Sequence, residues 1–281
     1  NRCRTYLLAA MLAAIATTTI PTPGTAASPA DRPGRTMGPS STPQRDTAFQ
    51  TVPERGRERD APPALHAGRA GSPPAIDGRI DEAVWGGAEV ATGFTQLRPD
   101  PGAPASQETE VRILYDDEAL YVAARMHDTA PDSIVAQLGR RDSQVYSEWF
   151  YVAVDSYFDR RTAFTFGLNP RGVQIDILLH NDTQEDDSWD AVWDGAATRD
   201  GEGWVAELRI PLSQLRFSPP EDGREQPWGV NFMRVIARTG EEAFWAPIEP
   251  DSPGLVSMFG ELQGLRNLDP PRRLEVMPYA L

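Results

Sequence analysis

Short runs of alternating apolar and polar residues, separated by turn-forming residues, constrain the fold of this chain more than any other feature. Such runs lie at 111–115, 119–125, 149–155, 162–168, 173–179, 204–210 and 228–236. Alternation with a period of two indicates strands that each bury one face, and neither a βαβ rhythm nor a long helical period accompanies them. The pattern predicts an all-β protein, an antiparallel β-sandwich of the jelly-roll or immunoglobulin-like type.

Residues 76–85 predict how that sandwich opens. Asp77-Gly78 is a turn dipeptide, because glycine tolerates a positive φ and aspartate bonds its own backbone. Asp81 is a favourable N-cap for one short helical turn that Trp85 would close. A second brief turn is expected at 211–215, where Pro211 occupies an early helical position.

Composition divides the chain into four segments. Arg2 and Arg4 precede an apolar run and a zone of small residues, which predicts a secretory signal peptide over residues 1–27; a retained membrane anchor is the alternative. Residues 28–64 are rich in Pro, Gly, Arg and Ser without periodicity, which is typical of a disordered linker. The sandwich is expected over 65–269, and 270–281 is interpreted as the start of a truncated C-terminal domain.

The charge and the side-chain inventory exclude several kinds of function. A net charge of −14 argues against nucleic-acid binding, which needs cationic side chains to neutralise phosphates. It is compatible with cations and with neutral partners such as sugars. The three histidines, His66, His127 and His180, match no nucleophile or zinc motif, and no phosphate-binding loop is present. We therefore expect a non-catalytic domain.

One face of the predicted sheet combines aromatic and polar residues. If the strands at 149–155 and 173–179 pair through the one between them, alternation places five side chains together: Trp149, Tyr151, Gln174, Asp176 and His180. A sugar ring stacks on an aromatic ring while its hydroxyl groups need convergent polar partners. The face therefore predicts carbohydrate binding. The alternative is that the two aromatic residues only cover a loop or a neighbouring strand.

An acidic loop follows at 180–190. Carboxylates at Asp182, Asp186, Asp187 and Asp190 offer the oxygen ligands that calcium prefers, although their spacing is not that of an EF-hand. A structural calcium ion is one interpretation of this loop, and a solvated acidic loop is the other.

Five motifs resemble those of the family 9 carbohydrate-binding modules, namely residues 76–85, 120–122, 152–155, 203–211 and 259–260. More specifically, residues 159–162, 169–174, 189–193 and 215–217 are similar to those of a bacterial envelope family in which such a module precedes a predicted outer-membrane β-barrel. The resemblance implies a secreted protein of the periplasm or outer membrane of a Gram-negative bacterium. It also implies that the module binds carbohydrate without cleaving it.

This chain departs from the sugar-binding members of that family at the residues that hold the sugar. Sugar-binding members hold the saccharide between two tryptophans, and the corresponding places here are Val145-Tyr146 and Pro253-Gly254-Leu255. Tyr151 stands where members have a ligand-contacting carboxylate, and Gly167 where they have an arginine. Substitutes for the missing clamp would be Trp149, Tyr146 or Trp245. The main prediction is therefore carbohydrate recognition, and the alternative is a structural or protein-interaction domain that packs on its own barrel.

Overall fold

The computed structural model describes residues 61–218 and 224–269. The predicted signal peptide, nearly all of the predicted linker and the segment 270–281 lie outside the described residues. Within the described residues, no helix is both long enough and apolar enough to cross a membrane.

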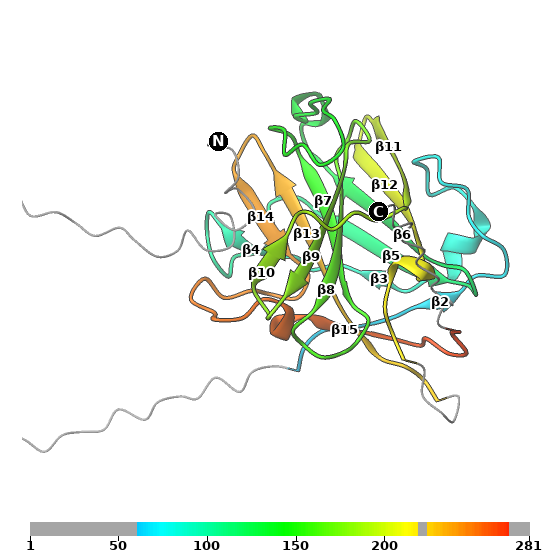
Figure 1. Cartoon of the computed structure of the whole chain (residues 1–281). Coiled ribbons are helices and arrows are strands. Elements are labelled where there is room, and N and C mark those ends of the chain that lie inside the picture. Colours follow the sequence, from blue (N-terminus) through cyan, green and yellow to red (C-terminus); the bar gives the residue numbers. More distant parts are fainter. Residues whose placement is uncertain (1–60, 219–223, 270–281) are drawn as a thin grey trace, which may run out of the picture. The chain divides into compact units, whose positions relative to one another are not determined.

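Nine strands form the first sheet, whose central members lie at the front of Figure 1. The order of its main path is β1 (Ala64–His66), β15 (Gly260–Gln263), β13 (Trp228–Ile236), β7 (Trp149–Asp155), β8 (Ala163–Leu168), β9 (Gln174–His180) and β10 (Gln184–Asp186). Two further strands extend it from β13, namely β14 (Glu241–Phe244) and then β4 (Thr95–Arg98).

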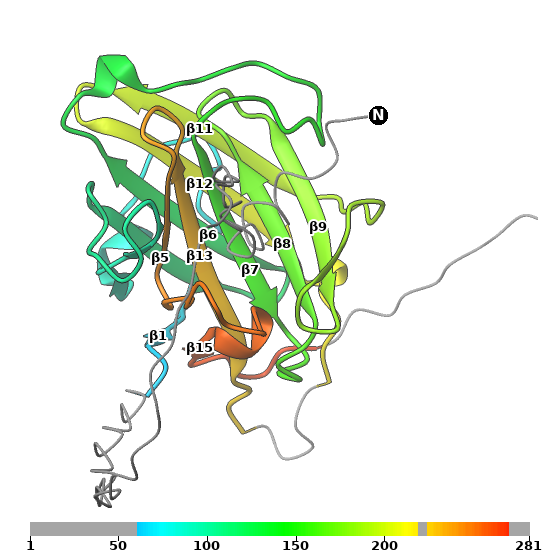
Figure 2. The same ribbon diagram turned by 90° about the vertical axis from the view of Figure 1, so that its left-hand side faces the viewer.

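Six strands form the second sheet, which packs behind the first as a separate layer (Figure 2). Its members are β11 (Asp194–Asp200), β12 (Gly203–Pro211), β6 (Ala119–His127), β5 (Thr109–Tyr115) and β2 (Gly68–Arg69), with β3 (Val90–Ala91) also paired to β5. Pairing is antiparallel except for β1 with β15 and β2 with β5. Four 3₁₀ turns complete the described elements: η1 (Ala83–Gly87), η2 (Pro131–Ser133), η3 (Leu212–Gln214) and η4 (Val256–Met258).

The predicted all-β sandwich is confirmed. All seven predicted strands are present, with ends within two residues of those expected. The brief turn after Pro211 is also present, as η3. Strand pairing begins at Ala64, opposite Glu261, so the sheet includes the last residue that was assigned to the linker.

Apolar side chains are buried in three clusters. The largest lies between the sheets and includes Phe150 and Phe166 from the first sheet and Trp204 from the second. Another covers the outer face of the first sheet, where Trp149 and Tyr151 pack with Ile175 and Phe259. Leu97 of β4 and the segment around η4 add apolar side chains to this outer cluster, so both faces of the first sheet are apolar.

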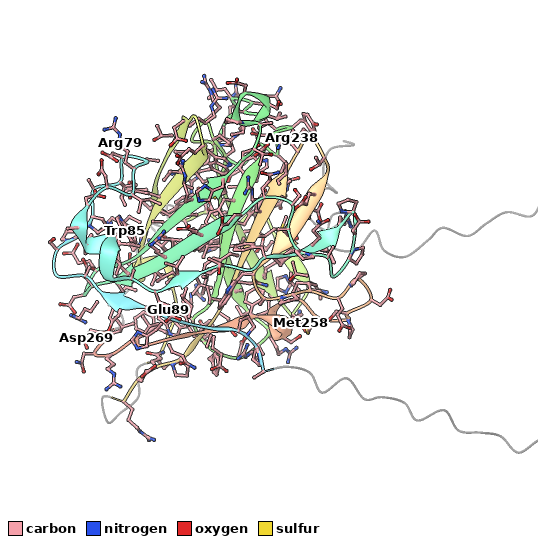
Figure 3. The ribbon with its side chains drawn as sticks, turned by 180° about the vertical axis from the view of Figure 1, so that it is seen from behind. Arg79, Trp85, Glu89, Arg238, Met258 and Asp269 are labelled. Atoms are coloured by element: carbon pink, nitrogen blue, oxygen red, sulfur yellow. The ribbon has the colours of Figure 1, made fainter. Side chains whose placement is uncertain are left out.

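The third cluster lies on the outer face of the second sheet, under the opening segment, and Trp85 is its largest member. Figure 3 shows the short turn η1 that carries Trp85 at the edge of this layer. The expected helical turn is thus present, but it begins at Ala83 after Glu82, and Asp81 is not its N-cap. Gly78 has a φ of +84°, as the turn dipeptide predicts.

A buried carboxylate holds the opening turn in place. Glu207 of β12 accepts hydrogen bonds at Oε2 from the backbone N–H groups of Asp77, Gly78 and Arg79, at 3.1, 2.8 and 3.1 Å. Burial nevertheless raises the pKa of Glu207 to about 7. The conspicuous motif at 76–85 therefore serves to dock the opening segment on the second sheet.

Candidate functional site

The strand register corrects the predicted sheet face. Tyr151 lies opposite Gly167, which in turn lies opposite Ile175. Residues aligned across a sheet share a face, so Trp149 and Tyr151 lie with the apolar set of β9. Gln174 and Asp176 point to the other side, into the space between the sheets. The prediction that these four side chains form one surface is wrong.

Trp149 and Tyr151 instead form the floor of a surface pocket on the outer face of the first sheet. The pocket has a volume of about 460 Å³. The two rings stack with centroids 5.7 Å apart and an angle of 24° between their planes, and each residue is only 5% exposed. Met233 and Val235 of β13 complete the apolar floor.

Tyr146 stands at the rim of this pocket and is 65% exposed. Its hydroxyl donates a hydrogen bond of 2.9 Å to the carbonyl oxygen of Ala237, which also lines the pocket. The ring is therefore held in place across the pocket mouth. Three of the predicted ligand-binding residues, Tyr146, Trp149 and Tyr151, are brought together here.

The polar members of the pocket wall are few, and sequence patterns did not single them out. They include Gln144, Ser147 and Glu242. Glu242 of β14 lies beside Val235 of β13, and Val235 in turn lies beside Trp149 of β7. This cross-strand row of three residues could not be found from sequence, because β14 is only four residues long and its partner strand was not predictable.

Burial strongly affects the acids near this floor. It raises the pKa of Glu242 to about 7, against the opposing effect of Arg98, and it raises the pKa of Glu185 to about 7. The pKa of the Tyr151 hydroxyl is also well above its usual range, because of burial and then of the negative charges of Glu185 and Glu242. Two carboxyl groups near Tyr151, one of them in the pocket wall, are thus desolvated.

An ion-pair cluster of Arg238, Glu148 and Asp128 holds together the segments that form the pocket wall. Arg238 lies at the end of the sandwich where β13 and β14 meet (Figure 3) and contacts Glu148 at 3.0 Å and Asp128 at 2.7 Å. Glu148 separates Ser147 from Trp149 in the chain, so the cluster links the two segments that form the pocket. Burial raises the pKa of Glu148 to about 7.

Asp176 and Gln174 belong to a separate polar group at the edge of the interior. The guanidinium group of Arg141 donates to Asp176 Oδ1, to Gln174 Oε1 and to the carbonyl oxygen of Ala191. Asp176 also accepts from the Ala191 N–H at 2.6 Å and is 2% exposed. These two predicted ligand-binding residues thus hold a loop in place and lie away from the pocket.

Trp245 and His180 do not reach the pocket either. Trp245 is 6% exposed and packs against Phe232 in the interior cluster, with ring centroids 5.4 Å apart. It therefore cannot serve as an exposed plate. The ring of His180 contacts the neighbouring Asn181 side chain, 3.2 Å from its Nδ1 atom.

The four predicted calcium ligands are not gathered at one point. Asp182 accepts three hydrogen bonds from the segment before β15, from the N–H groups of Leu255 and Ser257 and from the Ser257 hydroxyl. Asp186 accepts from Ser188. Among the described residues, the group of acids close enough to share an ion is Asp142, Asp176 and Asp190.

Arg141 already supplies positive charge to that group of acids. Its side-chain nitrogens lie 3.8 Å from a carboxylate oxygen of Asp142 and 3.6 Å from one of Asp190, in addition to the Asp176 contact. Only Asp190 is common to the predicted ligand set and this group. Calcium binding by the 180–190 loop stays a prediction.

The family model for "Carbohydrate family 9 binding domain-like" matches residues 76–242. No curated protein matches the chain.

Solved structures share the fold. A carbohydrate-binding module of family 9 from Caldicellulosiruptor kristjanssonii, in complex with cellotriose, is 20% identical with a TM-score of 0.51. The match covers 78% of this chain and 100% of that one, and the same module was also solved with glucose. A putative carbohydrate-binding protein from Bacteroides uniformis is 16% identical with a TM-score of 0.58, covering 72% of this chain and 99% of that one. The chain belongs to the carbohydrate family 9 binding domain-like family.

Proposed function

We propose that this domain binds carbohydrate in the pocket floored by Trp149 and Tyr151, with Tyr146 as the aromatic plate at its mouth. The observation that carries the proposal is the pocket itself, about 460 Å³ in volume, with an exposed ring at its mouth and stacked rings beneath. Aromatic surfaces with a few polar groups at the wall suit the apolar face and the hydroxyl groups of a pyranose.

The position of the pocket supports the same reading. The resemblance places the two stacking tryptophans at Val145-Tyr146 and roughly at Pro253-Gly254-Leu255. Val145 and Leu255 both pack in the apolar cluster of the outer face, and Val145 also lines the pocket, which supports a sugar site on this face. The tyrosine beside Val145 then provides the exposed ring that the first clamp position lacks.

The pocket wall is that of a binding site without hydrolytic chemistry. Glycosidases place two carboxyl groups on opposite sides of the scissile bond. Glu242 is the one carboxylate among the described residues that line this pocket. We therefore assign recognition alone to this site.

The secreted, outer-membrane setting remains part of the proposal. It rests on Arg2, Arg4 and the apolar run that follows them, together with the resemblance to modules that precede a β-barrel. Fractionation of cells that express the full-length protein, with antibody detection, tests it. Recovery in the cytoplasm would contradict it.

Calorimetric titration of the full 281-residue chain with glucose, cellotriose and a panel of other oligosaccharides tests the sugar site. Loss of the stacking ring in Tyr146→Ala should weaken binding roughly 3- to 10-fold, the scale of one aromatic contact. Tyr157→Ala is the matched control, because Tyr157 is 45% exposed and lies outside the pocket. No heat from any sugar with a folded sample would overturn the proposal.

The second candidate is a domain that packs against its own C-terminal β-barrel and binds no sugar. It is favoured by one observation, namely that the outer face at Tyr151 and Gly167 carries an aromatic side chain and a glycine where the resemblance calls for a carboxylate and an arginine. Failure of sugar binding, together with co-purification of the barrel segment expressed in trans, would support this second function.

A further inference from the structure

Glu242 is the one charged residue among the described residues that line the pocket. Its Oε1 atom lies 3.4 Å from a nitrogen of Arg98, the far end of the usual hydrogen-bond range. Its Oε2 atom is buried and has no hydrogen-bond partner among the described residues. The side chain is 13% exposed. A buried carboxylate oxygen without a donor is costly, and turning that oxygen into the pocket would let a ligand supply the missing donor.

Among the described residues, one arginine faces Glu242 and none lines the pocket. Arg98 faces it from β4 and engages one oxygen only. Tyr151 faces it from β7, and that hydroxyl also experiences the negative charge of Glu185 on β10. No arginine or histidine is among the described residues that line the pocket. A cation entering it would meet Glu242 and the faces of aromatic rings, an arrangement that attracts ammonium groups.

We infer that the pocket selects saccharides that carry a free amino group, with the ammonium placed against Glu242 and the aromatic floor. This inference rests on the proposed function and names the class of sugar that the site prefers. Rotation about the last torsion of glutamate is soft, so the carboxylate can turn Oε2 toward the ligand. A charge-assisted hydrogen bond there would be stronger than one from a neutral hydroxyl group.

The ionisation of Glu242 supports the selection and gives it a pH dependence. Burial raises the pKa of Glu242 to about 7, so the carboxylate is mostly neutral at pH 6 and mostly charged at pH 8. Preference for the amino sugar should therefore grow from pH 6 to a maximum near neutral pH. It should decline above that maximum, because the weakly basic amine of an amino sugar loses its proton there.

Calorimetric titration of the full chain with three trisaccharides tests this inference. They are the glucosamine trimer, its fully N-acetylated form and cellotriose, compared at pH 6 and at pH 7.5. We expect the free amine to bind at least about 10-fold more tightly than the acetylated form at pH 7.5, the scale of one charge-assisted bond. Glu242→Gln, which keeps the size of the side chain, should remove that preference while cellotriose binding persists.

A matched variant separates the pocket from the general charge of the protein. A chain with a net charge of −14 attracts any cation weakly, and Glu202→Gln removes the same charge from an exposed position that contacts Arg125 on the second sheet. Glu202→Gln should leave the preference intact. Equal loss in both variants, or equal affinity for all three trisaccharides, would overturn the inference while sugar binding itself stands. No binding of any trisaccharide would instead overturn the proposed function.

Discussion

Tyr151 lies with its ring against Gly167, the residue opposite it on the next strand. A Cβ atom at position 167 would come within 2.4 Å of the ring, closer than van der Waals contact allows. The glycine is therefore required by the tyrosine, and the pair sets the shape of the floor beside the pocket. A side chain at 167 and the tyrosine ring at 151 exclude one another.

Gly167→Ala should destabilise the fold by about 1 to 3 kcal/mol, the usual cost of overpacking a tight interior. In a Tyr151→Ala background the same substitution should be neutral or mildly stabilising, because the obstruction is gone and alanine is favoured over glycine in a strand. Urea denaturation of the two single variants and the double variant measures this coupling. Gly201→Ala is the control, since nothing lies within 4 Å of a Cβ at that position. Additive effects in the cycle would show that the two residues do not compete for space.

Glu207→Ala should release the opening segment from the second sheet. Three backbone N–H groups would lose their shared acceptor, which we expect to cost at least about 2 kcal/mol of unfolding free energy. Hydrogen exchange of residues 77–79 should accelerate more than that of β6 or β7. Glu207→Gln, which retains one acceptor, should show a smaller effect. Unchanged exchange at 77–79 in the alanine variant would show that Trp85 packing alone holds the segment.

The seven long strands could be predicted from the sequence because each alternates over five or more residues. Strands such as β4 and β14 could not, since four residues carry too little periodicity and their pairing depends on distant segments. Side chains from these short strands and from the segment around η4 join the apolar cluster on the outer face of the first sheet. For this reason alternation alone could not tell which apolar set faced the second sheet, because both sets are buried.

The pocket residues were therefore only partly accessible from sequence. Tyr146, Trp149 and Tyr151 could be proposed from aromatic character and strand phase. Alternation predicts Gln174 and Asp176 on the exposed face, because Ile175 and Ile177 form an apolar set, but those two isoleucines lie in the outer cluster. The burial of the Asp176 carboxylate is explained by its contact with Arg141, a loop residue more than thirty positions away. No local sequence pattern predicts that contact.

Asp176→Ala should destabilise the protein by about 1 to 3 kcal/mol, because it removes the buried acceptor that the Arg141 guanidinium and the Ala191 N–H share. It should also weaken ligand binding at the pocket, since Arg141 anchors the loop that continues to Gln144 and Tyr146. Asp142→Asn is the control, because Asp142 is 47% exposed at its side chain and lies 3.8 Å from Arg141. Denaturation and sugar titration of both variants test the two effects. Equal stability of both variants would contradict the assignment.

The stability of the protein should fall as the pH rises from 5 to 8. Burial raises the pKa of Glu148, Glu185, Glu207 and Glu242 to about 7, whereas glutamate in an unfolded chain titrates near ~4.3. Between these values the folded state binds more protons than the unfolded state. Unfolding free energy therefore decreases with pH across this window, by at most about 1.4 kcal/mol per pH unit for each group.

Below that window the trend should reverse. Arg238 and backbone N–H donors hold the pKa of Asp128 below its usual range despite burial, and hydrogen bonds to Arg125 do the same for Asp200. The unfolding free energy that these two ionised aspartates contribute is lost as the pH falls through their lowered pKa values. Urea denaturation from pH 3.5 to 8.5 should therefore show a maximum near mildly acidic pH. Glu148→Gln should flatten the alkaline limb, and a stability that rises steadily from pH 5 to 8 would show that these glutamates are ionised in the folded protein.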